Sequence, residues 1–185
     1  MRLPATSRRL VVDTNVARSA SESEKPVSDA CRQVLQTMLS EQHRVVLSAT
    51  QYWEWQKHQS GFSKNWLRQM VGRKLHVVLS PEPDSGLTER IYALNCTDKA
   101  QAEMLKDVHL LENALATDDV VLSQETSVFG LFCRYAAALQ VPRPVAWVHP
   151  VDDAPACVAW IKAGAEVGNV RCVPAGTYRN APPLP

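Results

Sequence analysis

The chain has 185 residues, 45% of them hydrophobic, which suits one domain with a sizeable core. Its formal net charge of +1 provides no global field for nucleic acid, so any nucleic-acid binding must use a local basic face. The five cysteines are scattered, which disfavours a zinc knuckle or a disulfide framework and indicates a reduced, cytoplasmic setting. No segment has the apolar length of a signal peptide or a membrane span, so we expect no membrane partner.

Short apolar runs alternate with helical patterns along the chain. We expect strands at 10–12, 44–48, 76–80, 120–122 and 145–148, with a polar turn at 13–15 after the first. We expect helices at 27–39, 52–58, 63–72, 85–94, 98–116 and 128–139. This alternation predicts an α/β fold with a mostly parallel sheet. Residues 151–185 are expected to form a C-terminal extension, partly helical around 156–163 and then a proline-rich tail that is extended and mobile from 180.

Four acidic residues stand at strand ends or within helices. Asp13 follows the first strand and Glu125 follows the strand at 120–122, while Glu54 and Asp107 lie in helices. Taken singly, each could be a turn residue, a cap or a solvated charge. Carboxylates at the carboxyl ends of neighbouring parallel strands point into one crevice, where like charges are unfavourable unless a hard cation separates them. The pattern therefore predicts a magnesium or manganese site and phosphodiester cleavage.

Residues 12–16, Val-Asp-Thr-Asn-Val, resemble the opening motif of PIN domains, a family of metal-dependent nucleases that includes VapC-type toxins. Residues 107–115 and 120–125 resemble the third and fourth motifs of that family, and Glu54 matches the second. The resemblance spans residues 9–148 and implies a three-layer α/β/α nuclease domain at 9–150, with a mostly parallel sheet of four to five strands. It implies that four carboxylates hold Mg²⁺ or Mn²⁺ and perform catalysis, with two supporting polar residues: Asp13, Glu54, Asp107 and Glu125, and Asn15 and Ser123.

One position departs from the family pattern, because the fourth acid is usually Asp and here is Glu125. The leading hypothesis is a divalent-metal-dependent endoribonuclease acting on single-stranded or structured RNA, of the toxin–antitoxin type. Its expected partners are an RNA substrate, a protein antitoxin and a second copy in a homodimer. A chain longer than the usual compact toxin weakens the toxin role. The alternatives are a catalytically degenerate PIN-like module that binds RNA or protein, and a different acidic-crevice fold that acts on phosphomonoesters.

A locally basic stretch at 57–76 follows Glu54. Basic groups with interleaved aromatic rings suit single-stranded nucleic acid, through phosphate contacts and base stacking. The alternative is that the tryptophans pack the core and the basic side chains face solvent. The predicted nucleic-acid-binding residues are Lys57, Lys64, Arg68, Arg73 and Lys74, and the interleaved aromatic residues are Trp53, Trp55, Phe62 and Trp66.

Three further polar residues lie near the acids in the sequence: His109, Glu112 and Asp118. His109 is close to Asp107 in the sequence but points to another side of the helix, so it is expected to be a surface or satisfied histidine rather than a ligand. Asp118 could lie at the rim of the site, and Glu112 could support it. The chain has neither a nucleophile-elbow spacing nor a glycine-rich phosphate loop, which disfavours a serine hydrolase and a nucleotide triphosphatase.

Overall fold

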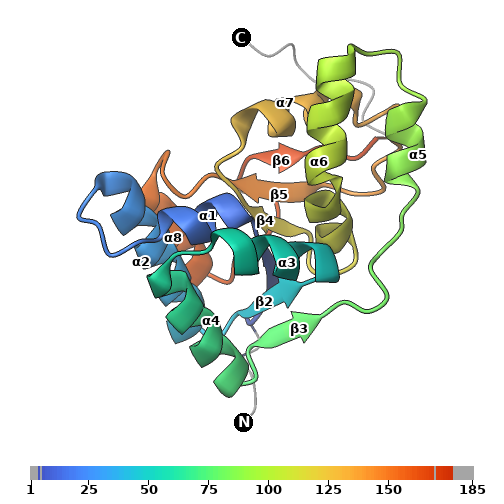
Figure 1. The fold of residues 1–185 in the computed structure, drawn as a ribbon. Helices are drawn as coiled ribbons and strands as arrows, with labels where there is room; N and C mark the ends of the chain where they lie inside the picture. Colours follow the sequence, from blue (N-terminus) through green and yellow to red (C-terminus); the bar gives the residue numbers. More distant parts are fainter. Residues whose placement is uncertain (1–3, 5, 169, 177–185) are drawn as a thin grey trace.

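The computed structural model describes residue 4, residues 6–168 and residues 170–176, and shows an α/β fold with helices on both faces of a central sheet (Figure 1). Among these residues, six strands form the sheet in the order β3-β2-β1-β4-β5-β6. The first five are parallel, and β6 pairs antiparallel with β5. The strands are β1 (Arg9–Val12), β2 (Arg44–Leu47), β3 (His76–Val78), β4 (Val120–Leu122), β5 (Val145–Val148) and β6 (Cys172–Val173).

This architecture confirms the predicted three-layer α/β/α class with a mostly parallel sheet. The helices of the described part are α1 (Thr14–Ser19), α2 (Pro26–Ser40), α3 (Ala49–His58), α4 (Gly61–Gly72), α5 (Leu87–Tyr92), α6 (Asp98–Leu115), α7 (Thr126–Tyr135) and α8 (Ala154–Lys162). Polar residues begin several of them, because Ser48, Ser60 and Thr97 each accept a hydrogen bond from the backbone N–H three residues on.

Two elements differ from the sequence prediction. The expected turn at 13–15 is the beginning of α1, and Asp13 caps that helix by accepting from the Asn15 N–H. With only six residues, α1 is too short to show a helical repeat in the sequence. The sixth strand, β6, has only two residues. It is defined by its pairing with β5, since two residues show no alternation of apolar and polar side chains.

The sheet is buried on both faces, as expected for parallel strands covered by helices. Alternate residues of β1 point to opposite faces: Leu10 and Val12 belong to one core and Val11 to the other. The first core is completed by α1, α2, α3, α4 and α8, and the second by α5, α6 and α7. Trp55 and Trp66 are buried in the first core, so these two tryptophans serve packing rather than RNA.

The C-terminal segment contributes to the same layers. Helix α8 packs on α2, and its Cys157 and Ile161 are buried in the first core. The proline-rich tail expected from residue 180 lies outside the described residues. Within the described part of the chain, every helix is too short or too polar to cross a lipid bilayer.

The strand order sets the position of the functional site. Strands β1 and β4 are neighbours, but the chain continues from β1 towards β2 on one side and from β4 towards β5 on the other. In open α/β sheets such a reversal leaves a crevice at the carboxyl ends of the two strands, where ligands bind. Asp13 follows β1 directly and Ser123 follows β4 directly, so both lie at this edge.

Candidate active site

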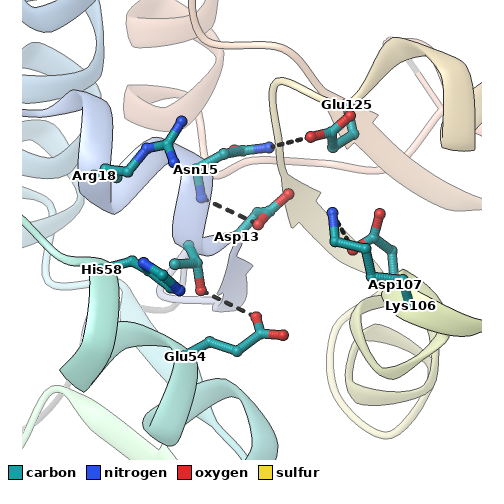
Figure 2. A pocket seen from close by; sticks show the side chains of 9 residues that line it. Asp13, Asn15, Arg18, Glu54, His58, Lys106, Asp107 and Glu125 are labelled. Carbon is teal, nitrogen blue, oxygen red and sulfur yellow. Dashed lines mark hydrogen bonds and ion pairs between the residues drawn. The ribbon is translucent and has the colours of Figure 1, made fainter. Parts of the chain in front are cut away.

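All four predicted acids line one cavity of about 350 Å³ at the carboxyl edge of the sheet. Figure 2 shows their side chains around a common space, although they come from four separate segments of the chain. Asp13 comes from the end of β1, Glu54 from α3, Asp107 from α6, and Glu125 from the turn between β4 and α7. The other lining residues are Thr14, Asn15, Arg18, His58 and Lys106.

Asp13 is the most firmly held of the four carboxylates. Its Oδ2 accepts a hydrogen bond of 2.6 Å from the Ser123 hydroxyl, and its Oδ1 accepts one of 3.2 Å from the Asn15 backbone N–H. The residue is 6% exposed, and burial raises its pKa despite these two hydrogen bonds, which act in the opposite direction. One carboxylate of the cavity is therefore desolvated and fixed in orientation.

Asn15 joins the ends of β1 and β4. Its side-chain oxygen accepts from the Gln124 N–H at 3.1 Å, and its carbonyl accepts from the Gln124 side chain at 3.1 Å. Its Nδ2 lies 3.5 Å from Glu125 Oε1, and the Glu125 N–H donates to the Ser123 hydroxyl oxygen at 3.0 Å. The structure thus places Asn15 and Ser123, the two predicted supporting residues, in contact with the acids at both strand ends.

Asp107 shows the electrostatic effect of the cluster most clearly. It is 8% exposed, and its pKa is raised to about 7, chiefly by burial. The neighbouring charges of Asp13, Glu125 and Glu54 raise this pKa further, while Lys106, with its Nζ 3.8 Å from Asp107 Oδ1, lowers it. Three other carboxylates therefore disfavour the ionised form of Asp107, and added positive charge in the cavity would favour it.

Glu54 faces two partners that were not predicted. Thr14 Oγ1 donates to Glu54 Oε2 at 3.2 Å, and His109 Nε2 lies 3.7 Å from the same oxygen. His109 Nε2 is buried and makes no hydrogen bond within the described part of the chain. The expectation of a surface or satisfied histidine is therefore wrong, because the approach of α6 to α3 turns this side chain towards Glu54.

A buried hydrogen-bond network connects the end of β1 to α3 and α6. Gln51 donates from Nε2 to the Val12 carbonyl at 2.5 Å, and the Trp55 indole N–H donates to the same carbonyl at 3.1 Å. Asn113 on α6 donates to Gln51 Oε1 at 3.3 Å and to the Ser48 hydroxyl at 3.1 Å. These contacts tie α3 and α6 to the residue before Asp13, and thereby fix three of the four acid-bearing segments relative to each other.

The cavity has a basic rim that differs from the one expected. Arg18 on α1, His58 on α3 and Lys106 on α6 line it and are exposed (Figure 2). Because residues 14–19 are helical, Asn15 and Arg18 fall on one face of α1 at a spacing of three residues, but a six-residue helix leaves no periodic pattern by which the sequence could reveal this. The predicted nucleic-acid-binding residues are exposed on α3, on α4 and in the following turn, outside the lining of this cavity: Lys57, Lys64, Arg68, Arg73 and Lys74.

Asp118 and Glu112 lie outside the acidic cavity. Asp118 does not lie at the rim of the cavity but at the opposite end of the strands, beside the first residue of β1. Its Oδ2 accepts from the Arg9 N–H at 2.7 Å, and its Oδ1 lies 2.6 Å from Arg9 Nη2. It precedes β4 and pairs with the first residue of β1. Glu112 accepts from the Ser85 N–H and hydroxyl, at 3.3 and 3.0 Å, and does not line the cavity.

The acids that line the cavity supply oxygen donors only. All four acidic groups offer oxygen, which Mg²⁺ and Mn²⁺ prefer. Among the described residues, no three histidine, cysteine, aspartate or glutamate side chains are close enough to hold one ion together. Mg²⁺ commonly retains several waters and uses only one or two carboxylates directly, so carboxylates spaced around this cavity suit a partly hydrated ion.

Comparisons of the chain with protein-family models, with curated proteins and with solved structures gave no match. The chemistry of the site must therefore be inferred from its own residues. An acidic cavity with a basic rim, open at the switch point of the sheet, can accept a cation together with an anionic substrate.

Proposed function

We propose that the chain is a divalent-metal-dependent endoribonuclease that hydrolyses phosphodiester bonds in RNA. One observation carries the proposal: four carboxylates from distant segments line a single cavity at the carboxyl edge of the sheet. Such a concentration of like charge disfavours the ionised cluster unless a cation joins it, as the raised pKa of Asp107 illustrates. The order and identity of the acids also resemble the motifs of PIN domains.

The four acids differ in how firmly the protein holds them, and would therefore contact a metal ion in different ways. Asp13, held by Ser123 and Asn15, offers a fixed oxygen ligand, and Asp107 faces it from α6. Glu54 and Glu125 are less buried and have longer side chains, so they can adjust to a direct or a water-mediated contact. A bound Mg²⁺ or Mn²⁺ would neutralise phosphate charge and lower the pKa of water.

The chain's own cations face the substrate. An acidic cavity by itself repels an RNA backbone, so binding needs positive charge close to the acids. Arg18 and His58 form no ion pair or hydrogen bond among the described residues, and Lys106 is held loosely at 3.8 Å from Asp107. These three groups remain available for phosphate oxygens on either side of the bond to be cleaved.

A toxin–antitoxin role, with a protein antitoxin and a homodimer, is the part of the proposal that rests on the resemblance alone. The second candidate function is a PIN-like module that binds RNA or protein without cleaving RNA. Glu125, which stands where the family usually has Asp, favours this alternative, since its longer side chain changes the reach of one of the four acids.

The test is cleavage of single-stranded RNAs of varied sequence by purified protein, with EDTA and with Mn²⁺. We expect cleavage only with Mn²⁺, a loss of about 100-fold or more in Asp13→Asn, and full activity in Glu24→Gln, which removes an exposed carboxylate outside the cavity. Equal activity of Asp13→Asn and wild type would contradict the assignment. RNA binding without cleavage would favour the degenerate module, and turnover of a small aryl phosphate would favour a phosphomonoesterase.

A further inference from the structure

A second cavity, of about 440 Å³, lies where α3, the end of α4 and the edge strand β3 meet. It is mainly apolar, and we call it the aromatic pocket after Tyr52 and Trp53 in its wall. Six large hydrophobic residues of the described part are exposed, and four of them line this pocket: Tyr52, Trp53, Val71 and Val78. Clustering of exposed apolar side chains in one place is typical of a binding surface.

Trp53 is the most prominent member of the aromatic pocket. It is 72% exposed, and Tyr52 beside it is 44% exposed. Their ring centroids lie 6.3 Å apart at an interplanar angle of 68°, an edge-to-face contact that orients both rings. Trp55 and Trp66, by contrast, are buried and donate their indole N–H groups to backbone carbonyls. The fold therefore uses Trp55 and Trp66 for packing and leaves the Trp53 ring available to a ligand.

The aromatic pocket and the acidic cavity share helix α3. Glu54 and His58, four residues apart, face the acidic cavity, whereas Tyr52 and Trp53 face the aromatic pocket. An extended ligand that leaves the acidic cavity and crosses α3 reaches the aromatic pocket within one helix diameter, about 10–12 Å. A single extended ligand can therefore occupy both cavities.

Positive charge lies beside the aromatic pocket. Lys57 follows Trp53 by four residues on α3 and is exposed on the same side of the helix. Arg73 and Lys74 are exposed in the turn between α4 and β3, two and three residues after Val71 in the wall of the pocket. Three of the five basic residues predicted to bind nucleic acid therefore flank the pocket, and not the acidic cavity.

One acid opposes this charge. Glu82 lines the aromatic pocket, but Thr50 engages both of its carboxylate oxygens, through the backbone N–H at 2.5 Å and the hydroxyl at 3.1 Å. Its lone pairs are thus partly satisfied within the protein. The flanking lysines and arginine make no ion pair among the described residues and remain free for an anionic partner.

We propose that the aromatic pocket binds an unstacked base of single-stranded RNA, stacked on Trp53, while the backbone crosses α3 towards the acidic cavity. This inference rests on the proposed ribonuclease function and adds a binding site outside the cluster of acids. Aromatic faces combined with a basic border suit single strands, because every base presents a face for stacking and every phosphate a negative charge. A protein segment that adds a strand to the edge of β3 is the competing occupant, and the charge at the pocket's border favours RNA.

The experiment measures binding of a fluorescently labelled single-stranded RNA in EDTA, where cleavage does not interfere. Trp53→Ala should weaken binding about 5- to 150-fold, since stacking on one aromatic ring contributes about 1–3 kcal/mol. Trp53→Phe keeps an aromatic face and should lose much less. Tyr92→Ala removes another exposed aromatic side chain, on α5, and should leave the affinity unchanged.

Duplex RNA and salt provide further readouts. Bases in a duplex are already stacked, so Trp53→Ala should not weaken duplex binding. Lys57→Gln should reduce the slope of log K against log salt by about 0.7, the value for one phosphate contact to a single strand. Unchanged melting temperatures of the variants would show that the fold is intact.

Four outcomes overturn the inference: no measurable binding of single-stranded RNA by the wild type, unchanged affinity in Trp53→Ala, an equal loss for single strands and duplexes, or an unaltered salt slope in Lys57→Gln. Unchanged affinity would leave the aromatic pocket to a protein partner. The proposed function fails separately. If the protein cleaves RNA with a metal ion and Trp53→Ala binds RNA with wild-type affinity, only the base-binding site is contradicted. If Trp53→Ala weakens RNA binding and the wild type does not cleave RNA, only the nuclease function is contradicted.

Discussion

At the scale of single residues, the carboxylates of the acidic cavity are distinguished by their neighbours rather than by their type. Asp107 occupies an ordinary helical position in the sequence, but folding surrounds it with three other acids and removes it from water. Asp13 is likewise buried, and Ser123 and Asn15 fix its two oxygens. Removing the negative charge from Asp107 should therefore affect stability and metal binding in opposite directions.

Asp107→Asn should stabilise the metal-free protein above pH 7. The pKa of Asp107 is about 7 in the fold and 3.8 ordinarily, so between these values the folded state binds more protons than the unfolded state. The free energy of unfolding of the wild type therefore falls as pH rises from about 4 to 7, and the stability associated with the protonated acid is lost above that range. The neutral Asn side chain avoids the cost of ionisation, which amounts to at most about 4 kcal/mol for a shift of this size.

Urea denaturation of wild type and Asp107→Asn in EDTA, at pH 5 and pH 8, measures this effect. The advantage of the variant should be larger at pH 8, and added Mn²⁺ should stabilise the wild type and not the variant. A variant that is less stable than the wild type at pH 8 in EDTA would show that Asp107 carries no electrostatic cost.

The four acids were predictable as candidates because apolar strands and an amphipathic helix mark their positions in the sequence. Arg18 and His109 could not be found in this way. Arg18 belongs to a helix too short to leave a periodic pattern, and His109 meets Glu54 only because α6 packs next to α3. Trp53 and Trp55 also look equivalent in sequence, but the tertiary fold buries one ring and exposes the other.

At the scale of secondary-structure elements, the end of β1 is held in place by hydrogen bonds from α3, which α6 supports in turn. Its last carbonyl, that of Val12, accepts hydrogen bonds from Gln51 and from Trp55. Gln51→Ala should cost about 1–3 kcal/mol of stability, because it removes the buried hydrogen bonds of Gln51 with the Val12 carbonyl and with Asn113. It should also weaken Mn²⁺-dependent cleavage if Asp13 loses its orientation.

Gln56→Ala is the matched control, because it removes an exposed glutamine from the same helix and should change stability by less than about 0.5 kcal/mol. Denaturant midpoints for both variants measure the difference. Equal midpoints for Gln51→Ala, Gln56→Ala and wild type would show that the buried network does not support β1.

The long elements were predictable because their patterns are local: buried apolar runs for the strands of the parallel sheet and a regular apolar stripe for α6. The short elements were not. Helix α1 depends on a cap supplied by Asp13, and β6 depends on its partner β5. In both cases the contact that forms the element is made by a residue outside it, so the residues of the element alone do not predict it.

At the scale of the whole molecule, the strand order is what brings the acids together. Placing β1 next to β4 joins Asp13 to Ser123 across 110 residues of sequence. Sequence reasoning anticipated a shared edge from parallel strands, but it could not give the order of the strands, because pairing partners depend on contacts distant in sequence. Helix α8 and strand β6 complete the layers that hold this edge.

The measurement that tests the central claim most directly is Mn²⁺ binding at equilibrium, followed by electron paramagnetic resonance of the free ion. One shared site predicts that Asp13→Asn and Asp107→Asn, from β1 and α6, each weaken Mn²⁺ binding by about 10-fold or more, while Glu24→Gln has no effect. Wild-type affinity in both Asp13→Asn and Asp107→Asn would contradict the account, since the four acids would then not form one cation site.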